Sequence, residues 1–186
     1  MQKTPLYDSH VALGAKIVDF AGWQMPVEYK GLRAEHKQVR THVGLFDVSH
    51  MGEIRVRGPH SLETLQWLTT NDVATLSNGK AQYSLLPNFG GGIVDDLIVY
   101  CIEKNQDYLL CVNASNTGKD WDWIVKNNRG ADLKNESLDW GQIAVQGPKA
   151  MELVGRVLGE EAKNIATFHF ASVPYSGAVT YVARTG

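Results

Sequence analysis

A short unit occurs twice in this sequence and limits the folds open to it. Residues 56–63 (Val-Arg-Gly-Pro-His-Ser-Leu-Glu) and residues 145–152 (Val-Gln-Gly-Pro-Lys-Ala-Met-Glu) share the pattern of a strand end, a Gly-Pro step and the start of an amphipathic helix. Glycine allows the sharp turn, and proline at the first helical position gives up an N–H group that would lack a partner there in any case. The two copies predict two similar α+β lobes, which arise either from duplication or from independent use of the same turn chemistry.

Helix and strand patterns alternate along the chain, which predicts the α+β class. Amphipathic spacing predicts helices over residues 6–13, 31–42, 59–69, 115–127 and 148–158. Strand patterns cover residues 16–20, 45–48, 52–57, 83–86, 93–102, 108–112, 133–138, 142–145, 168–173 and 179–183, with turns at residues 22–26 and 104–107. Ile54 and Val56 alternate with Glu53, Arg55 and Arg57, so we expect residues 52–57 to form a half-buried strand.

Charge and composition exclude several functional classes. The sequence has 18 Lys+Arg against 20 Asp+Glu, so it lacks the basic field that binding to nucleic acid requires. No apolar run approaches the ~20 residues of a membrane-spanning helix. Cys101 and Cys111 lie in strand-like runs, where we expect buried thiols, with a hairpin disulfide as the alternative. The six histidines have no metal-binding spacing, and residues 1–5 lack the pattern of a targeting signal, so we expect no metal and a cytoplasmic protein.

Two adjacent carboxylates interrupt a long apolar strand in residues 90–100 (Gly-Gly-Gly-Ile-Val-Asp-Asp-Leu-Ile-Val-Tyr). Because successive side chains of a strand point to opposite faces, we expect Asp96 to share a face with Val94 and Ile98, and Asp95 to lie on the other face. A carboxylate among buried side chains is costly unless it is paired or used in chemistry. Either one of the two takes part in a reaction, or one caps a turn and the other binds an arginine or a backbone N–H.

Three further polar positions are candidates for a site. Asp47, Ser49 and His50 lie within four residues, but neighbouring strand side chains alternate faces, so we expect a polar turn or a site wall rather than a catalytic triad. Asn113 precedes a helix, where its side chain either caps the helix or meets a ligand. Tyr83 stands between Gln82 and Ser84 and could line a pocket for a flat ring.

These motifs together resemble the glycine cleavage T-protein family of aminomethyltransferases. The resemblance rests on residues 4–7 (Thr-Pro-Leu-Tyr), 18–26 (Val-Asp-Phe-Ala-Gly-Trp-Gln-Met-Pro), 43–52 (Val-Gly-Leu-Phe-Asp-Val-Ser-His-Met-Gly), 70–72 (Thr-Asn-Asp), 91–97 (Gly-Gly-Ile-Val-Asp-Asp-Leu), 112–116 (Val-Asn-Ala-Ser-Asn) and 145–148 (Val-Gln-Gly-Pro). It implies the folate-binding aminomethyltransferase fold, with mixed and antiparallel sheets and packed helices.

The resemblance also implies a reaction and a site. The aminomethyl carbon carried on the lipoyl arm of the H-protein would pass to the co-substrate tetrahydrofolate, with release of ammonia. The other glycine cleavage components, the P-protein and the L-protein, would be indirect partners, and no metal, nucleic acid or membrane would take part. The implied catalytic residue is Asp96, which the pattern of the strand alone does not distinguish from Asp95. The residues implied to line the folate are Met51, Tyr83, Ile98, Asn113 and Phe168.

Members of this family continue beyond the final Arg-Thr-Gly with Tyr-Thr-Gly-Glu, so we expect a truncated chain. The expected division is residues 1–50 plus 137–186 as part of a first domain, and residues 51–136 as a second, ferredoxin-like domain. Without the rest of the fold, the chain is expected to bind folate weakly and to have little or no activity. The alternatives are a non-catalytic folate-binding-fold module of the same superfamily, and an interaction module in which Asp95 and Asp96 are structural.

Overall fold

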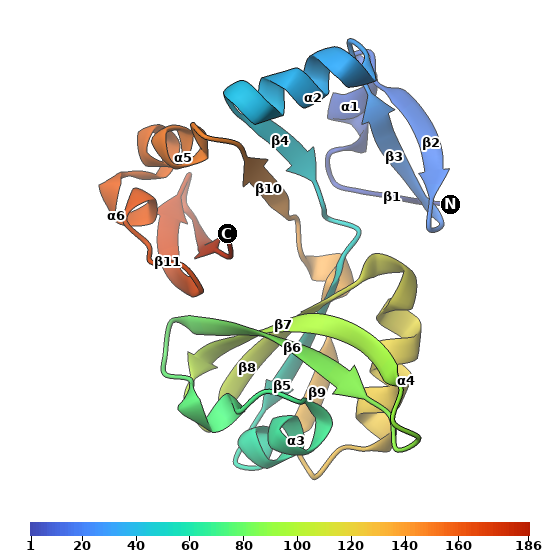
Figure 1. Cartoon of the computed structure of the whole chain (residues 1–186), viewed down its shortest axis with the longest axis vertical. Helices are drawn as coiled ribbons and strands as arrows, with labels where there is room; N and C mark the ends of the chain where they lie inside the picture. Colours follow the sequence, from blue (N-terminus) through green and yellow to red (C-terminus); the bar gives the residue numbers. More distant parts are fainter. The chain divides into compact units, whose positions relative to one another are not determined.

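The computed structural model describes residues 1–186, which form two compact units (Figure 1). Unit 1 contains Met1–His50 and Trp140–Asn164, and unit 2 contains Met51–Asp139 and Ile165–Gly186. Residues 165–186, which we expected in the first domain, pack with unit 2 because their first strand pairs with a strand of that unit. The division into evolutionary domains itself stays a prediction.

Unit 1 consists of two small sheets with helices. Its elements are β1 (Gln2–Lys3), α1 (Tyr7–Ala12), β2 (Lys16–Phe20), β3 (Trp23–Glu28), α2 (Leu32–Thr41), β4 (Gly44–Asp47), β10 (Ile143–Gln146), α5 (Ala150–Leu158) and α6 (Glu160–Lys163). The strand orders are β1-β3-β2 and β10-β4. The expected turn at residues 22–26 is wrong, because Ala21 and Gly22 both have positive φ and complete a two-residue hairpin turn, after which β3 begins at once.

Unit 2 is built on a seven-stranded sheet. Its elements are β5 (Gly52–Arg57), α3 (Ser61–Leu68), β6 (Lys80–Pro87), β7 (Ile93–Glu103), β8 (Asp107–Val112), α4 (Thr117–Lys126), β9 (Asp132–Asn135), β11 (His169–Tyr175) and β12 (Ala178–Arg184). The strand order is β12-β11-β6-β7-β8-β5-β9, and every pair is antiparallel. Short 3-10 turns occur at Val73–Thr75, Ala114–Asn116 and, near β5, Ser137–Asp139. The α+β class expected from the sequence is confirmed.

The core of unit 2 lies between the sheet and the helices α3 and α4, which lie on one side of it (Figure 1). Leu65 and Leu68 of α3 and Ile124 of α4 belong to one buried cluster with apolar residues of β5, β7 and β8. Two of these are Val99 of β7 and Leu110 of β8, which face each other across the ladder. The opposite face of the sheet therefore carries the residues that alternate with the core positions.

Strand β5 is buried on both faces, so the expected half-buried strand is wrong. Glu53 is 4% exposed and Arg55 is 7% exposed. The strand lies between β8 and β9 within the sheet. Arg55 tolerates burial because Asp107 accepts two of its N–H groups, from Nε at 2.6 Å and from Nη2 at 3.0 Å.

Both copies of the repeated unit form a strand, a glycine turn and a helix. They are β5–α3 in unit 2 and β10–α5 in unit 1. Gly58 (φ +88°) and Gly147 (φ +119°) occupy the turns, in a backbone region that residues with a Cβ rarely adopt. The local similarity is therefore present once in each unit. The expectation of two similar lobes is wrong, because unit 1 has a three-stranded and a two-stranded sheet whereas unit 2 has one seven-stranded sheet.

Smaller expectations have mixed outcomes. Cys101 and Cys111 form no disulfide, because the register places Cys101 opposite Tyr108 and Cys111 opposite Ile98. Helix α4 begins at Thr117, two residues after the expected start at residue 115. No helix of the structure is both long and apolar enough to cross a membrane.

Candidate functional site

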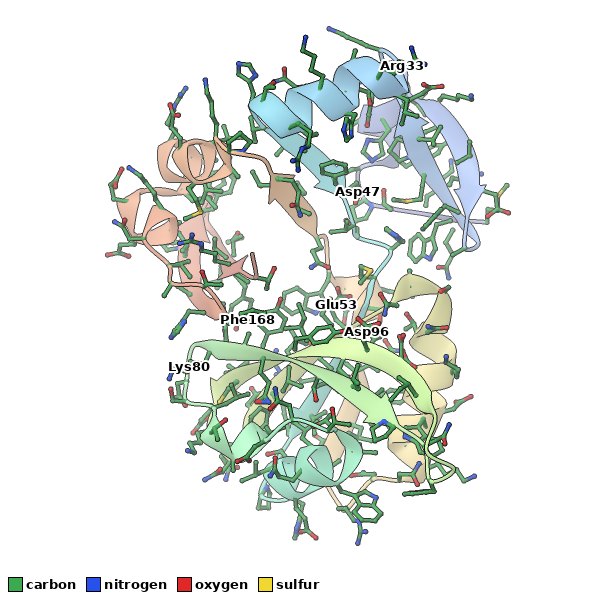
Figure 2. The ribbon with its side chains drawn as sticks, viewed as in Figure 1. Arg33, Asp47, Glu53, Lys80, Asp96 and Phe168 are labelled. Atoms are coloured by element: carbon green, nitrogen blue, oxygen red, sulfur yellow. The ribbon has the colours of Figure 1, made fainter.

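Asp96 lies on the face of the unit 2 sheet opposite α3 and α4, here called the Asp96 face. This face is defined by Asp96, Ile98 and Tyr100 of β7 and by Tyr83 and Leu85 of β6. The register sets Tyr83 directly opposite Ile98, and Leu85 opposite Asp96. Because directly paired residues project to the same side, an aromatic ring and two aliphatic side chains lie next to the carboxylate. Figure 2 shows Asp96 on the side of the sheet away from α3.

A β-bulge separates the two carboxylates from the glycine-rich loop. Leu86 pairs with Asp95 but Pro87 pairs with Ile93, which leaves Val94 as the extra residue of β7. Val94 packs against the core cluster, so the expectation that it shares a face with Asp96 is wrong. The expectation for Ile98 is confirmed by the register, since the ladder is regular beyond the bulge.

The Asn113 amide holds the Asp96 side chain, because its Nδ2 donates to Asp96 Oδ1 at 3.1 Å. Burial and the neighbouring Asp96 carboxylate raise the pKa of Tyr83, although this residue is half-exposed. None of the ion pairs in the chain includes Asp96. The carboxylate is therefore held in place by a neutral amide and is not neutralised by an arginine.

Asp95 points the other way and belongs to the helix side of the sheet. It is 7% exposed, and its Oδ1 accepts from Asn113 Nδ2 at 3.0 Å. Burial raises the pKa of Asp95, but the neighbouring polar groups of Asp120, Asn113 and Asn116 outweigh it and lower the pKa below its ordinary value. The two carboxylates left undistinguished by the sequence thus have different surroundings, one on the outer face and one in the core.

Asn113 joins these two carboxylates and does not act as a helix cap. It precedes the short turn Ala114–Asn116 and makes no side-chain cap there. Its amide is instead used on Asp95 and on Asp96, including the Asp96 carbonyl oxygen at 3.2 Å. Of the two explanations left open by the sequence, the cap is excluded.

Met51 and Phe168 lie at the margins of this region. Met51 directly precedes β5, whose Gly52 pairs with Val112 next to Asn113, so Met51 and Asn113 leave the sheet at the same end. Phe168 has a left-handed backbone (φ +55°), and its carbonyl oxygen accepts from Ala81 N of β6 at 2.8 Å. The sheet thus brings residues distant in sequence together, with Met51 at the start of β5 and Phe168 beside the start of β6. Figure 2 shows Phe168 near Lys80, the first residue of β6.

Glu53 is a buried acid on the Asp96 face. The sequence analysis did not identify it as a candidate for the site. Cys111 pairs with both Glu53 and Ile98, so the row Tyr83–Ile98–Cys111–Glu53 crosses four strands on the Asp96 face. Burial raises the pKa of Glu53 to about 8, and Oε2 has no hydrogen-bond partner. The alternation of residues 52–57 correctly separated Glu53 from the core residues Ile54 and Val56. The burial of the face that carries Glu53 depends on the neighbouring strands and could not be read from this alternation.

The Asp47-Ser49-His50 segment of unit 1 does not form a catalytic triad. Asp47 Oδ2 contacts His10 Nε2 at 2.8 Å, and its Oδ1 accepts from the backbone N–H of Ser49. The ring of His50 instead packs edge-on against Phe20. The expectation of a polar turn fits this geometry. No group of three or more His, Cys, Asp or Glu side chains is arranged to hold a metal ion.

Comparison with known proteins agrees with this architecture. The profile of the family described as GCVT N-terminal domain matches residues 6–186. The chain belongs to this family. An aminomethyltransferase from Bdellovibrio bacteriovorus is 61% identical over 186 residues, and one from Chlorobaculum parvum is 50% identical over 190 residues, each covering 100% of this chain.

A solved structure shows the same fold for the GCVT N-terminal domain described here. The crystal structure of glycine cleavage system aminomethyltransferase T from Bartonella henselae has a TM-score of 0.81 and 34% sequence identity, and it covers 91% of this chain. This chain spans 52% of the two aminomethyltransferases and 46% of the solved chain. The resemblance read from the sequence and the expected fold are confirmed, while the roles of single residues stay predictions.

Proposed function

We propose that this chain supplies the catalytic carboxylate and part of the folate site of a tetrahydrofolate-dependent aminomethyltransferase. The relatives that carry this activity in their names are about twice as long as the chain. The activity is therefore proposed for the full-length protein that contains this sequence. The observation that carries the proposal is Asp96. The neutral Asn113 amide holds its carboxylate on a sheet face beside Tyr83 and Ile98, and no ion pair includes it.

The proposed reaction moves one carbon. The carbon–nitrogen bond of the lipoyl-bound aminomethyl group breaks to release ammonia, and its carbon–sulfur bond breaks to return the thiol. Tetrahydrofolate supplies two nitrogens that bond to the carbon, and their two protons pass to ammonia and to the thiol. Asp96 would accept one of these protons or stabilise the positive charge that develops as ammonia leaves.

The Asp96 face suits such a ligand. Tyr83 offers an aromatic ring and Ile98 an aliphatic wall for flat rings, while Asn113 fixes the acid without adding charge. Met51 and Phe168 are proposed to extend this wall at the two ends of the sheet. The lipoylated H-protein is the proposed partner, with the P-protein and the L-protein as indirect ones. The cytoplasm is the proposed compartment.

The test is Asp96→Asn in the full-length protein, assayed for ammonia released from an aminomethyl-loaded lipoyl carrier in the presence of tetrahydrofolate. The amide keeps the shape of the side chain but can neither take a proton nor oppose a positive charge. We expect the turnover number to fall about 10²- to 10⁴-fold. Asp122→Asn on the exposed side of α4 is the control and should leave the rate unchanged.

An unchanged rate in the Asp96→Asn variant would exclude this carboxylate as the reacting group. Isothermal titration of the 186-residue chain with tetrahydrofolate tests a second expectation, that the chain alone binds folate weakly. Tight binding would show that these residues form the whole site. Tight binding with no transfer in the full-length protein would favour the non-catalytic module.

A further inference from the structure

Asp120 is a buried acid of unit 2 that the proposed reaction does not use. It lies on α4, one helical turn before the core residue Ile124, and its side chain is 0% exposed. Neither Oδ1 nor Oδ2 receives a hydrogen bond from any N–H or O–H donor group. A fully buried carboxylate without a donor is strongly disfavoured, so the group must be neutral or serve a partner.

The side chain of Asp120 interacts with the carboxylate of Asp95. Asp95 Oδ1 is satisfied by the Asn113 amide, whereas Asp95 Oδ2 has no N–H donor. Two buried carboxyl groups in contact are stable when they share one proton, which gives Asp95 Oδ2 its missing donor. Burial and Asp95 raise the pKa of Asp120 to about 8, and the bond from Asp120 lowers that of Asp95. Both directions place the proton on Asp120.

The Asn113 amide connects this pair to Asp96. Asn113 Nδ2 donates to Asp95 Oδ1 at 3.0 Å, to Asp96 Oδ1 at 3.1 Å and to the Asp96 carbonyl oxygen at 3.2 Å. The opposite orientation of the amide would set its oxygen against two carboxylates, so the negative charge of Asp95 fixes the orientation that serves Asp96. The hydrogen bonds therefore run from α4 through the sheet to its outer face.

We propose that Asp120 is a positioning residue for Asp96. Its proton-bearing carboxyl donates to Asp95 Oδ2, which fixes Asp95, and Asp95 in turn orients the Asn113 amide that holds Asp96. This inference rests on the proposed function of Asp96. It assigns to α4, on the far side of the sheet, a part in the geometry of the reacting carboxylate.

The inference has a consequence for pH dependence. The charged groups that act on Asp120 are Asp95 and Asp96 of β7, which favour its proton, and Lys119 of α4, which opposes it. Lys119 Nζ is bound to the Val94 carbonyl oxygen at 2.6 Å and is thereby held on the backbone of β7. Loss of the Asp120 proton at alkaline pH would set a second negative charge against Asp95. We therefore expect the turnover number to decline above a pH of about 8.

The experiment compares Asp120→Asn and Asp120→Ala in the full-length protein, with Asp122→Ala on the exposed side of the same helix as the control. Asparagine imitates the protonated acid and can donate to Asp95, so its turnover number at neutral pH should lie within about twofold of the wild type. Its alkaline decline should disappear. Alanine removes the donor, and the turnover number should fall about 10- to 100-fold with little change in KM for tetrahydrofolate.

Separate outcomes overturn the inference and the proposed function. A turnover number and a pH profile of Asp120→Ala that match Asp122→Ala would refute the role of Asp120, whatever Asp96→Asn does. Full activity of Asp96→Asn would instead refute the proposed function. Because Asp120→Ala could fail to fold, the carboxyl ¹³C resonance of Asp120 in the wild-type protein gives an independent test. An ionised Asp120 at pH 6.5 would overturn the inference.

Discussion

The isolation of Glu53 predicts a pH-dependent loss of stability that one substitution removes. Glu53 is 4% exposed, and Oε2 has no hydrogen-bond partner. Arg55 is two residues along the same strand and on the same face, but its guanidinium is bound by Asp107. Burial without a partner raises the pKa of Glu53 from 4.5 to about 8. The folded chain therefore holds a proton at neutral pH that the unfolded chain releases.

The sign and the size follow from this proton. The contribution of the bound Glu53 proton to the free energy of unfolding is complete below pH 4.5 and is lost as the pH rises through about 8. Between these two pH values the unfolded chain binds fewer protons than the folded chain, so stability falls as the pH rises. Between pH 6.5 and 7.5, one such group lowers the free energy of unfolding by about 1 kcal/mol. Glu53→Gln resembles the protonated side chain and cannot ionise. The free energy of unfolding of the variant, relative to the wild type, should rise by about 1 kcal/mol over that pH unit.

Urea denaturation followed by circular dichroism at pH 6.5 and 7.5 measures this difference. Burial lowers the pKa of His50, so this residue affects the pH dependence of stability with the opposite sign. The comparison of the variant with the wild type cancels this contribution, because His50 is present in both. Glu103→Gln, at the exposed end of β7, controls for the substitution itself. Parallel pH dependences of Glu53→Gln and the wild type would show that Glu53 is not protonated in the folded chain, and the reasoning from burial would be wrong.

Two further predictions concern stability. Asp107→Asn leaves the buried Arg55 guanidinium without its carboxylate, so urea denaturation should show a loss of about 3–5 kcal/mol; a loss below about 1 kcal/mol would mean that water replaces the partner. Gly147→Ala should cost about 3–5 kcal/mol, because an added Cβ would lie 2.6 Å from the carbonyl oxygen of His42 in addition to the strain of a positive φ. Gly58→Ala, at the matching turn with no atom within 4 Å of the added Cβ, should cost only about 1–2 kcal/mol. Equal losses at the two glycines would show that crowding by His42 has no effect.

Local pattern was a good guide wherever the decisive interactions lie close together in sequence. The long strand β7 and its hairpin to β8 came from apolar runs on either side of a polar turn, and the helices came from amphipathic spacing. The turn after β2 was placed wrongly, because Ala21 adopts a positive φ that an alanine in the sequence does not predict. The bulge at Val94 was missed for a related reason, since a bulge is defined by the partner strand.

The candidate site shows the same division. Asp95 and Asp96 were found as a pair from their place in an apolar strand, but the strand alone did not say which of them faces the core. Asp120 carried a usable signal that was overlooked, namely a carboxylate on the same helical face as Ile124. No sequence signal indicated the role of the Asn113 amide, because its partners Asp96 and Asp95 are 17 and 18 residues away along the chain.

The sequence by itself determined most of the helices and strands, the two strand–Gly-Pro–helix units and, through long motifs, the family. These depend on periodicity, turn chemistry and residue identity, all of which are local or directly readable. Only the tertiary structure decided which acids are buried and which partners they meet. Burial and hydrogen bonding arise when β5, β7 and α4 pack together, and that packing makes Glu53 and Asp120 hold protons while Asp96 stays on the outer face of the sheet.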